Sequence, residues 1–121
     1  MQIQVLRTKI HRAQVTESCL DYEGSLTIDE ALMDRVGMVP YERILCGNLA
    51  NGNRFETYAI RGRRGSGEII LNGAVAHLGK TGDRLTIMSY TWAEPAAAAD
   101  WNPSVIVLGE HNRIENERKG P

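Results

Sequence analysis

Charge of one sign, long apolar runs, cysteine and aromatic residues are all scarce in this sequence. The 14 Lys and Arg residues are balanced by 15 Asp and Glu residues, and the formal net charge of −1 gives no general attraction to nucleic acid or anionic lipid. No stretch approaches the roughly 20 apolar residues of a membrane span. Residues 1–9 alternate polar and apolar types and lack the apolar core of a signal peptide. We therefore expect a cytoplasmic protein without membrane or nucleic-acid partners.

The two cysteines, Cys19 and Cys46, lie in apolar stretches without CxxC spacing or nearby histidine ligands. We predict two free, partly packed thiols, as is usual in a reducing cytosol, and a disulfide has no support in the pattern. His77 and His111 have no companion Cys, Asp or Glu at a metal-ligand spacing, so no metal site is predicted.

We expect one domain over residues 1–121, because a second core would leave each half too small to be stable. Short strand-like runs separated by glycine-containing turns, with one or two short helices, are typical of a compact, mainly β barrel. The predicted strands cover residues 3–15, as one long or two short strands, then 43–46, 54–60, 69–71, 85–90 and 104–108.

Helices are expected to be short. Asp29 can cap a helix that carries Leu32, Met33 and Val36 on one face and ends at Gly37. Further helical segments are predicted around residues 76–78 and within 94–101.

Asn51-Gly52 separates two of the predicted strands and tolerates positive φ at both centres of a tight turn, so a hairpin is expected there. From His111 the chain is charged, which predicts a frayed tail.

Gly24-Ser25 lies in a predicted loop between a strand-like run and the Asp29 helix. Glycine allows strained or positive-φ backbone and leaves its carbonyl unshielded. The Ser25 hydroxyl could therefore attack the Gly24 carbonyl and convert the amide into an ester. Elimination and hydrolysis would then leave a terminal pyruvoyl group and ammonia. The dipeptide alone is a weak signal, because an ordinary turn has the same sequence.

Several unlinked blocks, in matching order and spacing from about Leu6 to Leu108, resemble the aspartate 1-decarboxylase family. The blocks are Lys9-Ile10-His11-Arg12-Ala13, Tyr22-Glu23-Gly24-Ser25, Thr27-Ile28-Asp29, Asn51-Gly52 with Arg54, Thr57-Tyr58-Ala59-Ile60, Arg64-Gly65-Ser66-Gly67, Asn72-Gly73-Ala74, Ala76-His77 and Gly82-Asp83. Two positions depart from the family pattern. Val75 stands where members usually carry Ala, which predicts a bulkier wall beside the substrate, and Gly47 stands where some carry Trp.

The resemblance implies a double-psi β-barrel and a homotetramer with active sites between neighbouring subunits. It implies self-cleavage into a β chain, residues 1–24, and an α chain, residues 25–121, with or without a maturation factor. The cofactor would be a covalent pyruvoyl group derived from Ser25, with no pyridoxal phosphate and no metal. Such an enzyme decarboxylates L-aspartate through a Schiff base to β-alanine and carbon dioxide, and supplies β-alanine for pantothenate and coenzyme A biosynthesis.

The resemblance also assigns roles to single residues. Thr57 matches the residue that assists cleavage and contacts substrate, and Tyr58 matches the proton donor. A phenol can protonate the substrate's Cα if it is held within about 3 Å. Gly73, Ala74 and Val75 match the substrate-binding loop, whose backbone amides can meet a carboxylate.

Cations are expected to bind the carboxylate that stays on the substrate. A salt bridge to the departing carboxylate would stabilise the ground state more than the transition state. We therefore assign Arg54, with its two-donor fork, and Lys9 to the retained side-chain carboxylate. His11, on the same strand face as Lys9, either positions Tyr22 and tunes the site or is structural. Tyr22 either shapes the cleavage loop or packs, and Asn72 either orients the substrate loop or caps the next helix.

Three other interpretations are open. Arg61, Arg63 and Arg64 form a local basic loop that would suit a nucleic-acid-binding barrel, but no aromatic residues interleave with them as a stacking surface. An unprocessed regulatory relative would keep the fold without the activity. A pyruvoyl decarboxylase for another amino acid is the nearest alternative among enzymes.

Overall fold

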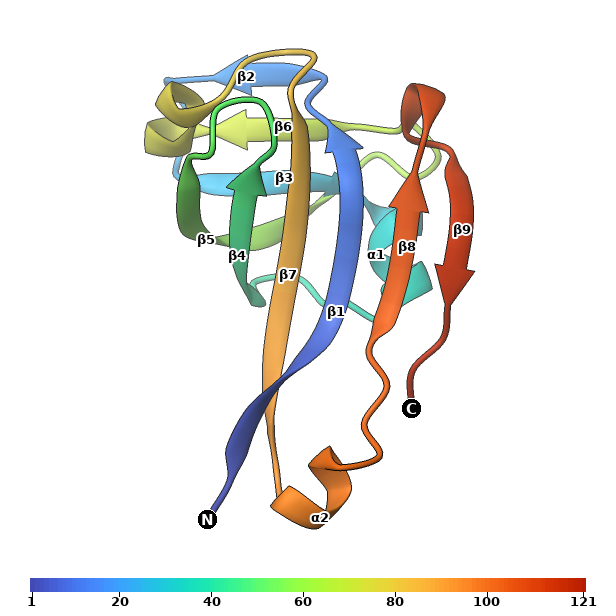
Figure 1. Ribbon diagram of the computed structural model, residues 1–121. Helices are drawn as coiled ribbons and strands as arrows, with labels where there is room; N and C mark the ends of the chain where they lie inside the picture. The colour runs from blue at the N-terminus through green and yellow to red at the C-terminus, as the bar shows by residue number, and fades with distance from the viewer.

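The computed structural model describes residues 1–121 as a nine-stranded sheet with short helices. Figure 1 shows the long β1 and β7 side by side, with β2, β6 and β3 crossing behind them. The strands are β1 (Ile3–Gln14), β2 (Glu17–Cys19), β3 (Ser25–Asp29), β4 (Arg43–Asn48), β5 (Arg54–Gly62), β6 (Ile69–Asn72), β7 (Arg84–Ala93), β8 (Ser104–Leu108) and β9 (Ile114–Arg118). The helices are α1 (Glu30–Val36) and α2 (Pro95–Ala98), and the 3-10 helices are η1 (Gly73–Leu78) and η2 (Glu110–Asn112).

The sheet has the order β2-β6-β3-β5-β4-β7-β1-β8-β9 and curves around one core. β5 joins its two halves, because it pairs in parallel with β3 and antiparallel with β4. After β1 the chain turns across the barrel end, where Val15 N–H donates to the Asp83 carbonyl and Thr16 N–H donates to the Ile69 carbonyl, both at 2.8 Å. The prediction of a mainly β barrel with short helices is confirmed.

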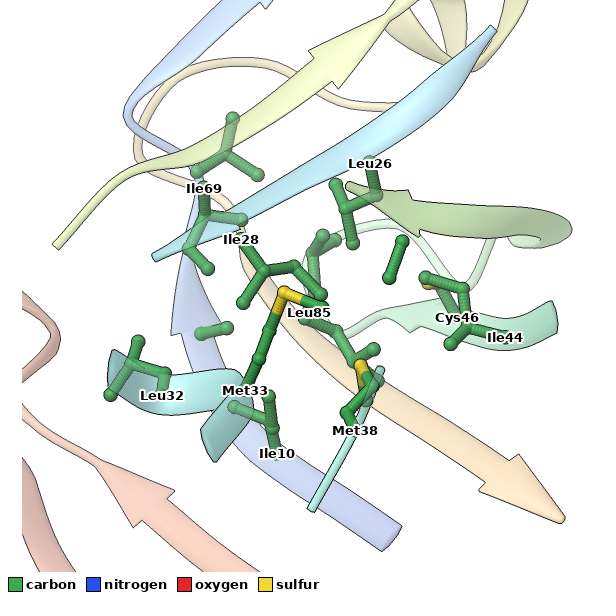
Figure 2. Close-up of a cluster of buried hydrophobic side chains, with 14 of the residues drawn as sticks. Ile10, Leu26, Ile28, Leu32, Met33, Met38, Ile44, Cys46, Ile69 and Leu85 are labelled. Carbon is green, nitrogen blue, oxygen red and sulfur yellow. The ribbon is translucent and has the colours of Figure 1, made fainter. Parts of the chain in front are cut away.

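The core is filled by aliphatic side chains from both halves of the sheet. Figure 2 shows Leu26 and Ile28 of β3 close to Leu85 of β7, with Met33 of α1 packed beneath them. These side chains belong to a cluster of 21 buried residues. The thiol of Cys46 is part of this cluster, and burial raises its pKa. Both cysteines are free.

The helix predicted after Asp29 is α1. The Asp29 carboxylate accepts from Ala31 N–H at 2.8 Å as the N-cap, and Gly37 closes the C-terminus with a left-handed φ of 79°. Leu32 and Met33 are buried, as their spacing predicted.

The hairpin between β4 and β5 forms, but its turn differs from the prediction. Of Asn51 and Gly52, only Gly52 has positive φ, and the loop runs over residues 49–53. The side chains of Asn48 and Asn51 explain the wider loop, because each accepts from a backbone N–H two residues on, at Ala50 and Asn53.

The prediction of a frayed tail is wrong. Residues Ile114–Arg118 form β9, which pairs antiparallel with β8. Glu117 accepts two hydrogen bonds from the Arg35 guanidinium, at 2.8 and 2.9 Å, which ties the strand to α1. The open edge of β8 therefore orders a segment whose composition alone suggests disorder. None of the helices has the length and apolar character that crossing a membrane would need.

Candidate active site

Ser25 is the first residue of β3, at the point where the chain enters the barrel from an exposed loop. Its side chain is 1% exposed, whereas residues 20–24 are all exposed. Its backbone pairs with Asn72 at the end of β6, and the next residue, Leu26, lies opposite Ala59 of β5. The Gly24–Ser25 peptide bond thus spans the boundary between a loop and a fixed strand.

The Ser25 hydroxyl is held by a buried amide. Asn72 Nδ2 donates to Ser25 Oγ at 3.0 Å and to Thr27 Oγ1 at 2.8 Å. The Asn72 side chain does not cap η1, so the capping alternative is wrong. Ser25 Oγ also lies 3.5 Å from the Glu23 carbonyl, a long contact in the direction of the loop. The nucleophile expected from the sequence therefore has a defined position.

Gly73, and not Gly24, has a backbone conformation and a close contact that favour glycine. Gly24 does not adopt the positive φ that glycine would allow it, and a Cβ there would meet no atom within 4 Å. Gly73 has a φ of 68° and packs against the backbone of Tyr22 and Gly24. Ala74 is exposed. The Val75 side chain packs in the core, so it does not make the wall of this loop bulkier as we expected.

Thr57 and Tyr58 lie on β5, the strand that pairs in parallel with β3. The β3–β5 ladder starts at Leu26 opposite Ala59. Ser25 and Tyr58 each stand one residue before this pair on the two strands, whereas Gly24 lies before the start of β3. Tyr58 also stacks at a tilt on Tyr41, with ring centroids 5.9 Å apart. Tyr41 has a positive φ of 68°, and no sequence signal pointed to it.

Lys9 and His11 lie on β1, separated from β3 in the sheet by β5, β4 and β7. Arg54 is in register with Gly47, Thr86 and His11 across β5, β4, β7 and β1. Neither Lys9 nor Arg54 forms an ion pair, since every salt bridge involves another cation. No hydrogen bond or strand pairing within the chain joins Lys9 or His11 to Ser25.

His11 bonds to Thr86 and not to Tyr22. Its Nδ1 lies 2.9 Å from Thr86 Oγ1. Burial lowers the His11 pKa, and the charges of Lys9 and Arg12 lower it further, so these surroundings favour the neutral ring. Tyr22 is 54% exposed, and only its main-chain carbonyl meets the site, against Gly73.

The arginines of the 61–67 loop are largely neutralised. Arg64 donates to Asp34 at 2.5 Å and to Glu30 at 3.1 Å, and Arg61 lies 3.8 Å from Glu30. These contacts leave Arg63 as the one arginine of the loop without an ion pair. The loop is therefore a poor basic surface for nucleic acid.

The class of protein can now be stated: a small β barrel with a buried serine hydroxyl directly behind an exposed Gly-Ser bond. The family model of aspartate decarboxylase matches residues 1–115. The chain is 50% identical to an aspartate 1-decarboxylase of Chloroherpeton thalassium, over 93% of this chain and 83% of that protein. It is also 50% identical to one of Ralstonia nicotianae, over 95% and 96%, and 53% identical to one of Leptospira biflexa, over 93% and 97%. The chain belongs to the aspartate decarboxylase family, which confirms the resemblance inferred from its motifs.

Proposed function

We propose that this protein cleaves itself at Gly24–Ser25 and then decarboxylates L-aspartate to β-alanine and carbon dioxide. The observation that carries the proposal is the Ser25 hydroxyl, buried and held by Asn72 directly after an exposed glycine. Membership of the family supplies the substrate. The product would serve as the β-alanine precursor of pantothenate, made by a cytoplasmic homotetramer.

The cleavage needs only the chain and one water molecule. Ser25 Oγ attacks the Gly24 carbonyl carbon, the C–N bond breaks, and the nitrogen takes the proton, which gives an ester. Loss of the Ser25 α-proton and of the Gly24 carboxylate leaves dehydroalanine at position 25. Water then replaces the nitrogen, which leaves as ammonia, and a pyruvoyl group remains. Thr57, on the neighbouring strand β5, would assist the first step, as the family resemblance implies.

The surroundings of Ser25 fit a pyruvoyl group. The position is buried, the ladder partner Asn72 offers an amide donor, and Gly73 leaves room for a backbone to approach. When formed, the group supplies a carbonyl that accepts the electron pair released as the α-carboxylate leaves. Tyr58 holds the phenolic proton that returns to the substrate's Cα.

Lys9 and Arg54 would bind the carboxylate that the substrate retains. Both cations lack a carboxylate partner within their own chain. Lys9 lies on β1, and β5, β4 and β7 stand between β1 and β3 in the sheet order. In the homotetramer that the family resemblance implies, a neighbouring subunit would complete the site.

Intact mass spectrometry tests the proposal. We expect the wild-type chain to yield residues 1–24 and a pyruvoyl-initiated 25–121 chain, and to release carbon dioxide from L-aspartate. Ser25→Ala should remain one inert chain. Borohydride added with L-aspartate should attach substrate mass to the larger wild-type piece. An uncut wild-type chain that still turns over L-aspartate would exclude the proposed chemistry.

A further inference from the structure

We propose that Gly73, which we expected only to bind substrate, also positions the peptide bond that is cleaved. The inference rests on the proposed self-processing. A Cβ built at Gly73 would lie 2.7 Å from the Tyr22 carbonyl oxygen, 2.8 Å from Gly24 N and 2.9 Å from Gly24 Cα. Since Cβ atoms essentially never approach other heavy atoms this closely, no other residue fits without displacing the backbone on one side.

The Gly73 side of this contact is anchored at both ends. Before Gly73, Asn72 pairs with Ser25 in the β6–β3 ladder. At the end of η1, the Leu78 carbonyl accepts hydrogen bonds from the side-chain amides of Asn48, Asn51 and Asn53, at 3.1, 3.3 and 3.4 Å. These bonds join η1 to the β4–β5 loop, so the segment that carries Gly73 cannot easily retreat.

The other side is free to move. Neither Glu23 nor Gly24 takes part in a hydrogen bond between two backbone groups, and both are exposed. The one hydrogen bond to their main chain is the long contact from Ser25 Oγ to the Glu23 carbonyl, at 3.5 Å. A side chain at position 73 would therefore shift Gly24, and the carbonyl that is attacked belongs to Gly24. Ser25 Oγ would stay in place, because Asn72 and the ladder hold it. The nucleophile and its target would separate, and a misplacement of about 1 Å can slow a reaction on the order of 10²-fold.

Gly73→Ala tests this inference through the rate of cleavage, followed by intact mass on freshly purified chain. We expect cleavage at least about tenfold slower than in the wild type. Gly37→Ala is the matched control, because Gly37 has a φ of 79° but a Cβ there would meet only the Arg7 guanidinium, at an ordinary contact distance of 3.9 Å. It carries the same backbone strain without the contact, and should cleave at the wild-type rate.

Gly73→Asn separates the contact from the strain. Asparagine tolerates positive φ better than alanine does, yet it has the same Cβ. We expect Gly73→Asn to cleave as slowly as Gly73→Ala, and recovery of the wild-type rate would show that strain alone was responsible. Both substitutions are also made in the uncut Ser25→Ala chain, where circular dichroism and urea unfolding should show a folded barrel.

The outcomes distinguish the two proposals. If the wild type is never cleaved, the proposed function fails. If the wild type is cleaved and Gly73→Ala is cleaved equally fast, the proposed function stands and the role of Gly73 is refuted. A Gly73→Ala chain that does not fold while Gly37→Ala folds also counts against this role, because the loop would then not be free to yield.

Discussion

The Asp83 carboxylate joins the last residue of β4 to the turn that follows η1. Its Oδ2 accepts from Asn48 Nδ2 at 2.9 Å and from Lys80 N–H at 3.0 Å. The Asn48 hydrogen bond is the main cause that lowers the Asp83 pKa, assisted by the Lys80 amide and charge and opposed by burial. Because its pKa is lower in the folded state, the ionised carboxylate stabilises the fold above its unfolded pKa. That stabilisation is lost as the pH falls through the lower, folded value.

We expect Asp83→Asn to lower the free energy of unfolding by about 1.5–3 kcal/mol at pH 7, the usual range for hydrogen bonds to a charged group. The difference from the parent chain should shrink as the pH falls below about 4. Urea unfolding of the uncut Ser25→Ala chain measures both effects. Asp100→Asn removes the same charge at an exposed position and should change little. An equal loss at pH 3 and pH 7 would contradict the role given to the carboxylate.

The role of a single residue could be predicted from the sequence where it depends on the chemistry of the side chain, and not where it depends on contacts between distant segments. Ser25 was predicted from the Gly-Ser pair together with the family resemblance. For Asn72 the sequence left two roles open, orienting the substrate loop or capping the next helix. From the sequence we singled out Gly24 for the backbone freedom of glycine. The close backbone contact lies instead at Gly73, and a sequence does not reveal which glycine another backbone segment approaches. The Asn48–Asp83 pair joins positions 35 residues apart and carries no local signal.

At the scale of elements, Asp29 connects β3, α1 and the 61–67 loop. Besides capping α1 through Ala31 N–H, its carboxylate accepts from Gly65 N–H at 2.9 Å and from Gly67 N–H at 2.8 Å. Three backbone donors therefore meet on one side chain that is 4% exposed. β3 carries Ser25 at its other end, so this cluster fixes the strand that presents the nucleophile.

Asp29→Ala should destabilise the uncut Ser25→Ala chain by at least about 2 kcal/mol, because it removes a cap and leaves two further amides without their acceptor. Asp34→Ala, also acidic and on α1, removes only an exposed ion pair with Arg64 and should cost less than about 1 kcal/mol. Urea unfolding compares the two. Equal losses would show that the loop contacts of Asp29 contribute nothing.

Most elements were predictable from local pattern, and the exceptions share one cause. The helix after Asp29 has capping residues in its own sequence, and the predicted strands have their own strand-like patterns of apolar residues. β2, β3 and β9 do not. β2 and β9 are ordered by the edges of β6 and β8, and β3, which begins at Ser25 where we predicted a loop, is ordered by pairing with β5 and β6. The wide hairpin loop likewise depends on side-chain turns at Asn48 and Asn51, which compete with the tight turn that Asn-Gly favours.

At the scale of the whole molecule, the proposed cut separates residues 1–24 from the rest without freeing them. β1 lies between β7 and β8, paired with β7 along nearly its whole length and with β8 over residues 8–11. Its side chains Ile10 and Ala13, and that of Val15 directly after it, are part of the core. The smaller piece would therefore remain bound after cleavage by the same ladders and packing that hold it before.

We expect both pieces of the processed protein to travel together in native mass spectrometry and size exclusion, and to separate only in denaturant. Unfolding should then depend on protein concentration, with a higher urea midpoint at higher concentration, because two chains must meet to refold. The uncut Ser25→Ala chain is the comparison, and its midpoint should depend less on concentration. Release of the small piece in buffer alone would contradict the inference.

The position of β1 between two strands also bears on whether the proposed cleavage comes before or after folding. A strand between two neighbours pairs with them most easily while it is still covalently tethered, so we expect the barrel to form before the proposed cleavage. If the bond broke in a nascent chain, residues 1–24 would diffuse away and leave the sheet without β1. The architecture therefore favours cleavage only after folding.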